Sequence, residues 1–220
     1  MRYQDKSIFP IPTDTDDDGI VAFSTAINCE MLIDAYSHGI FPWPFGEGED
    51  YIPWCSPVER GVLMIEDFHI PHGTRRDMKK WNFNFAVDRN FEEVITSCAK
   101  AQRPDQDGTW ITPAIIETYI KFHRLGYAHS FETYDADNNL VGGLYGISIG
   151  KIFCGESMFH HVSGASKFAF INMVEFLKNK GAVIIDTQMV TNATGAFGAK
   201  EIPREKYIEL LKKYGGDPLF

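Results

Sequence analysis

Apolar residues recur along most of the chain in short runs bounded by polar turns, a pattern typical of strands. Residues 83–87 alternate between apolar and polar positions, and the polar turn at 135–139 separates two longer apolar runs. On this pattern we predict strands at residues 61–65, 83–87, 128–134, 140–149, 153–159 and 184–188.

Helical periodicity occupies the segments between these runs. Asn28 is a favourable N-cap, and Gly39 is suited to end the helix that follows it. Asn90 with Glu93 matches a capping box, and Thr112 followed by proline opens a further helix. The predicted helices cover residues 29–38, 91–101, 113–125, 166–180 and 204–214.

Strands and helices alternate irregularly along the chain rather than in a strict repeat. This order predicts an α+β fold, in which a mixed sheet is flanked by helices. The N-terminal region is rich in proline and glycine and contains one clear helix. We therefore expect a small N-terminal domain over residues 1–62 and a larger domain over residues 63–220.

Three polar side chains interrupt two of the most apolar predicted strands. Glu156 lies within the run 153–159, and Asp186 and Gln188 lie within the run 184–188. Because side chains alternate between the faces of a strand, Asp186 and Gln188 are expected to project together. A polar group buried without a partner costs about 2–7 kcal/mol, so residues of this kind point to a functional site.

The chain has 220 residues, of which 30 are acidic and 21 basic, so its net charge is −9. This charge argues against a general polyanion-binding surface. A local one stays open, because Arg75, Arg76, Lys79 and Lys80 fall within six positions. This cluster is compatible both with a solvated face and with a patch that contacts phosphates.

No apolar run approaches the roughly 20 residues that span a bilayer, and residues 1–19 are polar and acidic. We therefore expect a cytoplasmic protein that makes no membrane contact. The four cysteines are far apart and form no CxxC pair, which argues against a zinc site and against a disulfide framework. We expect buried thiols at Cys29, Cys55, Cys98 and Cys154.

Parts of the sequence fit other chemistries less well. Coenzyme A-dependent acyl transfer suits the element order, but the turn at 160–166 has one glycine and lacks the arginine or glutamine that opens a pyrophosphate-binding turn. The apolar neighbours of Cys154 disfavour a reactive thiol. His160 and His161 could bind a metal, but adjacent strand residues point apart, so loop histidines are the better interpretation.

A binding module without catalytic activity is a further alternative. Trp43, Trp54 and Trp110 could stack on the bases of a single-stranded nucleic acid, at roughly 1–3 kcal/mol for each base. The acidic total and the three polar strand residues argue against this as the whole function.

Several motifs occur in order over about residues 35–210. They are AYSHGIFPW at 35–43, WCSP at 54–57, TWI at 109–111, LVGGLYG at 140–146, FCGESMF at 153–159 with ASK at 165–167, and IDTQ at 185–188 with GA at 198–199 and IPR at 202–204. With these motifs at this spacing, the chain resembles the leucyl/phenylalanyl-tRNA–protein transferases.

The resemblance implies transfer of Leu or Phe, less readily Met, from aminoacyl-tRNA to proteins that begin with Arg or Lys, marking them for degradation by the N-end rule. It implies a larger domain similar to the Gcn5-related N-acyltransferases, and neither a metal nor a cofactor. Thr191-Asn192-Ala193 stands where the family usually carries a histidine. The alternative is a coenzyme A-dependent N-acyltransferase of the same fold, or, because this histidine is missing, a catalytically weakened protein that binds the tRNA 3′ end.

The resemblance also suggests roles for individual residues. The expected catalytic residues are Asp186, Gln188 and Glu156. Trp54 and Trp110 are expected to flank the terminal adenine, and Arg75, Arg76, Lys79 and Lys80 to contact tRNA phosphates. The other expected substrate-binding residues, most of them apolar, are Phe153, Ser157, Met158, Phe170, Met173, Leu177, Ile185 and Thr191.

The chemistry of such a transfer needs no strong base. The donor ester is already activated, and an α-amine with a pKa of about 7.7–8.0 is roughly one-tenth neutral at pH 7. Asp186 with an ordinary pKa would accept a proton poorly from such an amine. We therefore expect Asp186 to fix Gln188 by a hydrogen bond, and the Gln188 carbonyl to hold the attacking amine in place.

Overall fold

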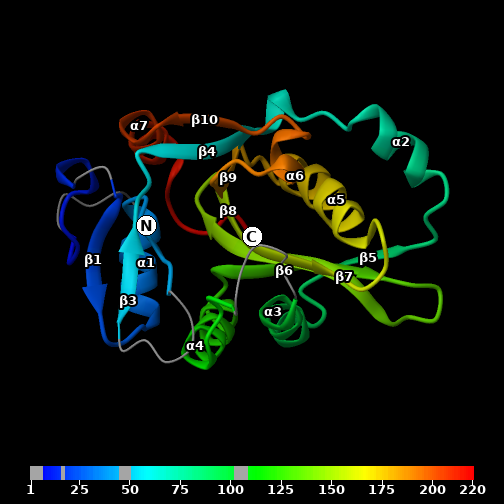
Figure 1. Cartoon of the computed structure of the whole chain (residues 1–220), viewed down its shortest axis with the longest axis horizontal. Coiled ribbons are helices and arrows are strands. Elements are labelled where there is room, and N and C mark those ends of the chain that lie inside the picture. The colour runs from blue at the N-terminus through cyan, green and yellow to red at the C-terminus, as the bar shows by residue number, and fades with distance from the viewer. Residues whose placement is uncertain (1–6, 16–17, 45–50, 102–108) are drawn as a thin grey trace.

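The computed structural model describes residues 7–15, 18–44, 51–101 and 109–220, which are organised around two sheets (Figure 1). The smaller sheet lies in the N-terminal region and has the antiparallel order β1–β3–β2. Its region contains the 3-10 helix η1 (Pro12–Asp14), β1 (Ile20–Ser24), α1 (Cys29–Ser37), β2 (Phe41–Pro42) and β3 (Ile52–Cys55).

The larger sheet has the order β10-β4-β9-β8-β7-β6-β5. Neighbouring strands are antiparallel except for β8 and β9, which run parallel near the centre. The strands are β4 (Glu59–Met64), β5 (Asn84–Val87), β6 (Ala128–Tyr134), β7 (Leu140–Ile149), β8 (Ile152–His160), β9 (Ile184–Gln188) and β10 (Lys200–Pro203).

Helices cover both faces of the larger sheet. In Figure 1, α5 (Ala165–Lys180) lies on one face, and α3 (Phe91–Lys100) and α4 (Pro113–Arg124) lie on the other. Alternate residues of the central strands supply the two cores: Phe153 and Ile185 pack with α5, whereas Ile152 and Ile184 join the core on the opposite face. The remaining helices are η2 (Ile65–Asp67), α2 (His72–Met78), α6 (Asn192–Gly195) and α7 (Arg204–Tyr214).

The predicted helix starts differ in how well the structure supports them. The Asn28 side chain accepts a hydrogen bond from the Met31 N–H (2.9 Å), as expected for an N-cap. Asn90 also precedes its helix, but the expected capping box is wrong. The Asn90 side chain donates to the Glu93 carboxylate. The Asn90 backbone N–H, which Glu93 would accept from in a capping box, donates to Glu132 Oε1 (2.7 Å).

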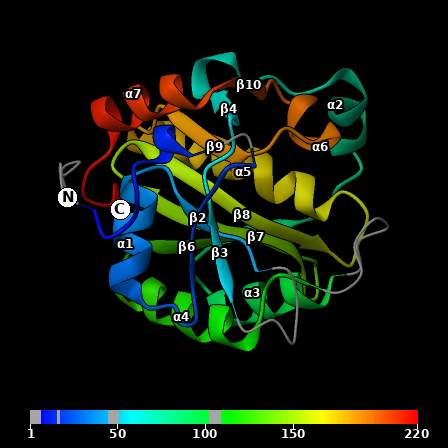
Figure 2. The same cartoon turned by 60° about the vertical axis from the view of Figure 1, so that its left-hand side comes forward.

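The predicted α+β fold is confirmed, with a small N-terminal part and a larger mixed sheet flanked by helices. The expected boundary at residue 62 falls inside β4, which belongs to the larger sheet from its first residue. Figure 2 shows α1 beside α4, and buried residues of both helices belong to one continuous core. No helix in the described part of the chain is long and apolar enough to cross a membrane.

Candidate active site

The site lies where the two parallel central strands separate. Cys154 of β8 is in register with Asp186 of β9, and beyond this point β8 continues alongside β7 only. Glu156 and Gln188 lie just past the divergence, where the Gln188 side-chain N–H donates to Glu156 Oε1 (3.0 Å). One hydrogen bond between side chains thus spans the point at which the backbone ladder ends.

Each of the two strands carries an irregularity at this point. On β8, Glu156 is the extra residue in a bulge against β7, and on β9, Thr187 is the extra residue in a bulge against β4. The strict alternation expected from residue 184 to 188 is therefore interrupted. Gln188 adopts a left-handed backbone (φ 60°), which is strained for a residue with a side chain.

A buried ion pair holds this strained backbone. Asp186 is fully buried, and its carboxylate accepts two hydrogen bonds from Arg60, from Nε to Oδ1 (2.9 Å) and from a terminal nitrogen to Oδ2 (2.6 Å). Tyr207 donates to Oδ2 (2.7 Å), and the Gln188 backbone N–H donates to Oδ1 (2.8 Å). Both carboxylate oxygens of Asp186 therefore accept hydrogen bonds that hold Arg60, Tyr207 and the Gln188 backbone in place.

Arg60 is buried by the same surroundings. Its guanidinium lies between the rings of Phe41 and Tyr207 and donates to the Gly39 carbonyl (3.1 Å). Burial is the largest single effect and disfavours the guanidinium charge, but the charge and hydrogen bonds of Asp186 together with Tyr207 outweigh it and raise the pKa of Arg60. Sequence reasoning missed Arg60, although a cation directly before the apolar run of β4 was the signal that could have revealed it.

Glu156, at the point where β8 and β9 separate, holds its proton more tightly than an ordinary glutamate. Its Oε2 is buried and makes no hydrogen bond with the residues that the structure describes. Removal from water raises the pKa of Glu156 to about 8, although the nearby Tyr36 hydroxyl and the Gln188 amide favour the carboxylate. The Tyr36 hydroxyl is itself hydrogen-bonded to that of Tyr119 (2.6 Å).

A pocket of about 290 Å³, here called the donor pocket, opens beside Glu156. Seven of the expected site residues line it: Glu156, Ser157, Met158, Phe170, Met173, Ile185 and Thr191. The other lining residues were not among the expected substrate-binding residues, although the sequence pointed to the position of Ala193; they are Leu144, Tyr145, Gly155, Thr187, Met189, Ala193 and Thr194. The walls are mainly apolar, and Glu156 is the one ionisable carboxyl group among the lining residues that the structure describes.

Comparison with known proteins decides the family. The family described as "Leucyl/phenylalanyl-tRNA protein transferase" matches residues 62–212, and its N-terminal domain matches residues 26–58. The chain belongs to this family. The leucyl/phenylalanyl-tRNA–protein transferase of Anaeromyxobacter dehalogenans is 42% identical over 97% of this chain and 90% of its own length. That of Sulfurimonas denitrificans is 44% identical over 93% and 88%.

Solved structures match much more distantly. The structure of FemX covers 84% of this chain and 71% of its own, with a TM-score of 0.45 and 11% identity. Similarity at this level does not bear on function.

Several of the site residues expected for a leucyl/phenylalanyl-tRNA–protein transferase lie outside the donor pocket. Phe153 and Leu177 are buried in the core between the sheet and α5 and do not line the pocket. Asp186 and Gln188 also do not line it, and they are buried, with 0% and 3% of their surface exposed. Ala193, in the segment where the resemblance leads us to expect a histidine, does line the pocket.

Trp54 and Trp110 are expected to flank the terminal adenine, and the position of Trp54 does not suit this role. Trp54 is 0% exposed, because Phe9 packs against it and its ring N–H donates to the Ser24 hydroxyl (2.8 Å), so it offers no face to a base. Trp110 stacks instead on Trp43, with ring centroids 5.6 Å apart and planes 13° apart. Trp43 is only partly buried, so this pair reaches the surface.

The four basic residues expected to contact tRNA lie on and just after α2. All four are exposed: Arg75, Arg76, Lys79 and Lys80. Arg75 donates to the Ile70 carbonyl (3.1 Å), and the exposed Asp77 lies 3.8 Å from Arg76. The patch is thus presented to solvent on a short helix that Figure 1 shows projecting from the body of the protein.

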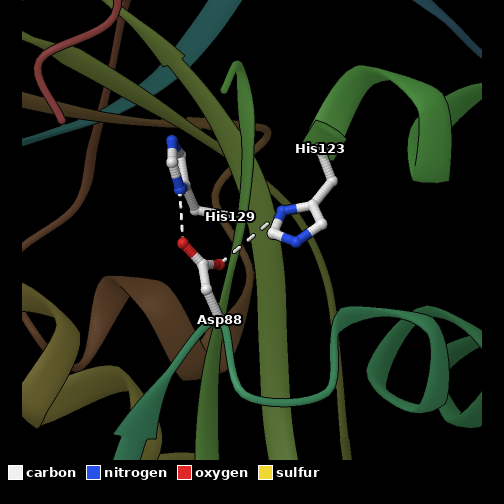
Figure 3. A group of neighbouring side chains, drawn as sticks. All are labelled: Asp88, His123 and His129. Atoms are coloured by element: carbon white, nitrogen blue, oxygen red, sulfur yellow. Dashed lines mark hydrogen bonds and ion pairs between the residues drawn. The ribbon is translucent and has the colours of Figure 1, made fainter. Parts of the chain in front are cut away.

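Two histidines and a carboxylate meet at the edge of the larger sheet (Figure 3). Asp88 Oδ2 lies 2.7 Å from His129 Nδ1, and its Oδ1 lies 3.9 Å from His123 Nδ1. Such a group could hold a metal ion. However, the His123 Nδ1 is 2.7 Å from the Ala128 carbonyl, and the second His129 nitrogen is 3.2 Å from the Gly126 carbonyl. These contacts join α4 to β6 and occupy His123 Nδ1 and both ring nitrogens of His129.

The cysteines complete the comparison with expectation. Cys98 and Cys154 are buried as predicted, whereas Cys29 and Cys55 are only partly buried, and none of the four forms a disulfide. Burial raises the pKa of Cys154 well above its usual value, which opposes a role as nucleophile.

Proposed function

We propose that this protein transfers Leu or Phe, less readily Met, from aminoacyl-tRNA to the α-amino group of proteins that begin with Arg or Lys. The transfer marks these proteins for degradation by the N-end rule. The observation that carries the proposal is the mainly apolar donor pocket, with Glu156 bonded to Gln188 at its edge, in a chain of this family.

The donor pocket would receive the side chain of the transferred amino acid. Met158, Phe170 and Met173 give it apolar and adaptable walls. Leu, Phe and Met are unbranched at Cβ and can extend into such a pocket, whereas Ile and Val are stiff next to the backbone and are excluded by shape. The pocket then places the ester carbon of the donor near Glu156.

The reaction is aminolysis of an ester. The neutral α-amine of the acceptor attacks the ester carbon, a C–N bond forms, the C–O bond to the terminal ribose breaks, and the amine proton leaves with the ribose oxygen. Gln188 would align the amine, because its N–H is held by Glu156 and its amide orientation is thereby fixed. Asp186 would act as a positioning residue, because it accepts a hydrogen bond from the Gln188 backbone N–H.

Glu156 would bind the α-amino group of the donor. Burial raises the pKa of Glu156 toward the pKa of about 7.7–8.0 of an α-amine, which lowers the cost of moving a proton between the two groups. The basic residues of α2 would contact tRNA phosphates, and the acidic surface elsewhere would attract acceptors with a cationic N-terminus.

Label transfer tests the proposal directly. The protein is mixed with labelled Phe-tRNA and a peptide that begins with Lys, and the control peptide carries an acetylated N-terminus. We expect label on the free peptide only. Transfer from acetyl-coenzyme A in place of Phe-tRNA would support the acyltransferase alternative, and binding of tRNA without transfer would support a weakened enzyme.

The role of Gln188 has its own test. Gln188→Ala should lower the single-turnover rate with Phe-tRNA by about 10²-fold, while the donor affinity changes little, because positioning of the amine is lost but the donor pocket is intact. An unchanged rate would contradict this role.

A further inference from the structure

Thr187 lines the donor pocket but has no role in the function proposed above. It is the extra residue of the bulge in β9, as Glu156 is of the bulge in β8, and both residues line the donor pocket. Bulges turn a side chain away from the direction that a regular ladder would give it, and they are frequent next to active sites. The two bulges therefore bring two polar residues to the wall of one pocket.

These two residues also share an unusual property. The Thr187 hydroxyl oxygen and Glu156 Oε2 are both buried, and neither makes a hydrogen bond with the residues that the structure describes. A buried polar atom without a partner is rare in folded proteins. The other two threonines of the lining differ, because the Thr191 and Thr194 hydroxyls lie 3.2 Å apart and bond to each other in the capping box of α6. A ligand in the donor pocket would supply the missing partners.

The Thr187 side chain can turn while its backbone stays fixed. Its hydroxyl lies beside Gly61 of β4, at 2.8 Å from the place that a Cβ would take. The backbone is held by two hydrogen bonds, from the Met189 N–H to the Thr187 carbonyl (2.6 Å) and from the Gln188 N–H to Asp186. Rotation about the Cα–Cβ bond moves the hydroxyl between staggered positions. An acceptor atom in the pocket would favour the rotamer that turns the hydroxyl toward it, because beside Gly61 the hydroxyl bonds to nothing.

The aminoacyl ester of the proposed donor offers a polar group to each of the two oxygens. Its α-amino group donates hydrogen bonds, which Glu156 would accept, and its carbonyl oxygen accepts them, which suits the hydroxyl of Thr187. Negative charge develops on the carbonyl oxygen when the amine attacks. A donor at this oxygen therefore stabilises the transition state more than the bound ester. None of the residues assigned to the reaction above donates there.

We infer that the Thr187 hydroxyl is a further catalytic group, which donates a hydrogen bond to the carbonyl oxygen of the ester as the amine attacks. This inference rests on the proposed function. As the C–N bond forms, one electron pair of the C=O bond moves to the oxygen, and the hydroxyl bonds to the resulting oxyanion. As the C–O bond to the ribose breaks, the C=O bond forms again, now in an amide. Thr187 keeps its own proton throughout.

Replacement of the hydroxyl by a methyl group tests this role. Thr187→Val keeps the branching at Cβ, and its single-turnover rate with Phe-tRNA and a peptide that begins with Lys should fall by about 10²-fold. Thr187→Ser keeps the hydroxyl and should retain most of the rate. The affinity of Thr187→Val for an unreactive analogue of phenylalanyl adenosine, with an amide in place of the ester, should change little, because the planar carbonyl carries no developed charge.

A charged tetrahedral analogue gives a readout that a purely structural role would not change. In a phosphonate analogue of phenylalanyl adenosine, a phosphorus atom replaces the ester carbon and a charged oxygen replaces the carbonyl oxygen. Thr187→Val should bind this analogue about 10²-fold more weakly than the unmodified protein, in proportion to the loss of rate. The matched control is Thr118→Val, a buried threonine of α4 outside the donor pocket, which should alter neither the rate nor the binding.

The unmodified protein reports on the proposed function, and the variants report on the inference. An unchanged rate or unchanged phosphonate binding in Thr187→Val would overturn the inference, and so would an equal loss in Thr187→Ser. A loss of phosphonate binding in Ser157→Ala instead would assign the donor to a different hydroxyl of the lining. If the unmodified protein transferred no label, the proposed function would fail and the inference with it. Thermal unfolding of each variant confirms that the fold is kept.

Discussion

Asp186 shows how a single residue can have a different task from the one its sequence position suggests. In the sequence it is an isolated carboxylate among apolar residues, and in the structure it is the centre of a buried hydrogen-bond network with Arg60, Tyr207 and the Gln188 backbone. Its partner Arg60 lies 126 positions away, beyond the reach of any local pattern. Asp186 therefore contributes by holding the bulged end of β9 in place.

Removal of Arg60 should destabilise the protein strongly. Arg60→Met leaves Asp186 buried without its counter-charge, so the free energy of unfolding should fall by about 3–5 kcal/mol. Combining it with Asp186→Asn should cost less than the sum of the two single changes. Urea unfolding measures both effects. The exposed pair Lys121–Glu117 is the control, since Lys121→Met should change stability by about 1 kcal/mol or less.

Glu156 should make stability depend on pH. Because its pKa rises from 4.5 to about 8 on folding, the folded protein holds a proton that the unfolded chain releases above pH 4.5. The free energy of unfolding therefore falls as pH rises from about 5 to about 8, by about 1–3 kcal/mol for a partly exposed group. The Glu156→Gln variant should lack this pH-dependent contribution to the free energy of unfolding. Unfolding at pH 5 and pH 9 should show it, and a pH-independent difference between the two proteins would contradict the raised pKa.

At the scale of elements, the bulge in β9 depends on a glycine in the neighbouring strand. Gly61 is in register with Gln188, and a Cβ at this position would lie 2.5 Å from the Met189 carbonyl carbon and 2.8 Å from the Thr187 hydroxyl. Backbone atoms cannot move aside as a flexible side chain can. Gly61 therefore allows β4 to pack closely against the strained end of β9.

Gly61→Ala should displace Gln188 while leaving the sheet intact. We expect the rate of label transfer to fall by about tenfold or more, because small displacements of aligned groups reduce rates sharply. The free energy of unfolding should fall by about 1–3 kcal/mol. Gly73→Ala in α2 is the control, since a Cβ there has no neighbour within 4 Å and should leave the rate of label transfer unchanged. Full activity in Gly61→Ala would show that the bulge tolerates the shift.

Prediction from sequence succeeded where an element depends on its own residues. The caps at Asn28 and Thr112 and the apolar runs of the central strands are local signals, and the structure confirms them. The bulges at Glu156 and Thr187 depend on the register of neighbouring strands, which no single strand encodes. For the same reason the donor pocket was predicted only in part. Met158 and Phe153 are similar in sequence context, but only the first reaches the pocket.

At the scale of the whole molecule, two buried arginines join the small sheet region to the larger sheet. Arg60 of β4 donates to the Gly39 carbonyl, and Arg204 of α7 donates to the Ser56 carbonyl (2.9 Å) and the Thr15 hydroxyl (2.7 Å). The core around α1 is also continuous with that of α4. The two parts therefore share both apolar packing and hydrogen bonds, and we expect them to unfold together.

Arg204 offers a test of this coupling away from Asp186. Arg204→Met leaves the buried Ser56 carbonyl without its donor, which should lower the free energy of unfolding by about 1–3 kcal/mol. If the two parts unfold as one unit, hydrogen exchange of β1, β3 and β8 amides should accelerate equally, by about ten- to a hundredfold. The control is Lys206→Met, an exposed residue of the same helix, which should change neither region. Faster exchange confined to β1 and β3 would instead mean that the small sheet opens by itself, and that the shared core and Arg60 are not enough to couple it to the site.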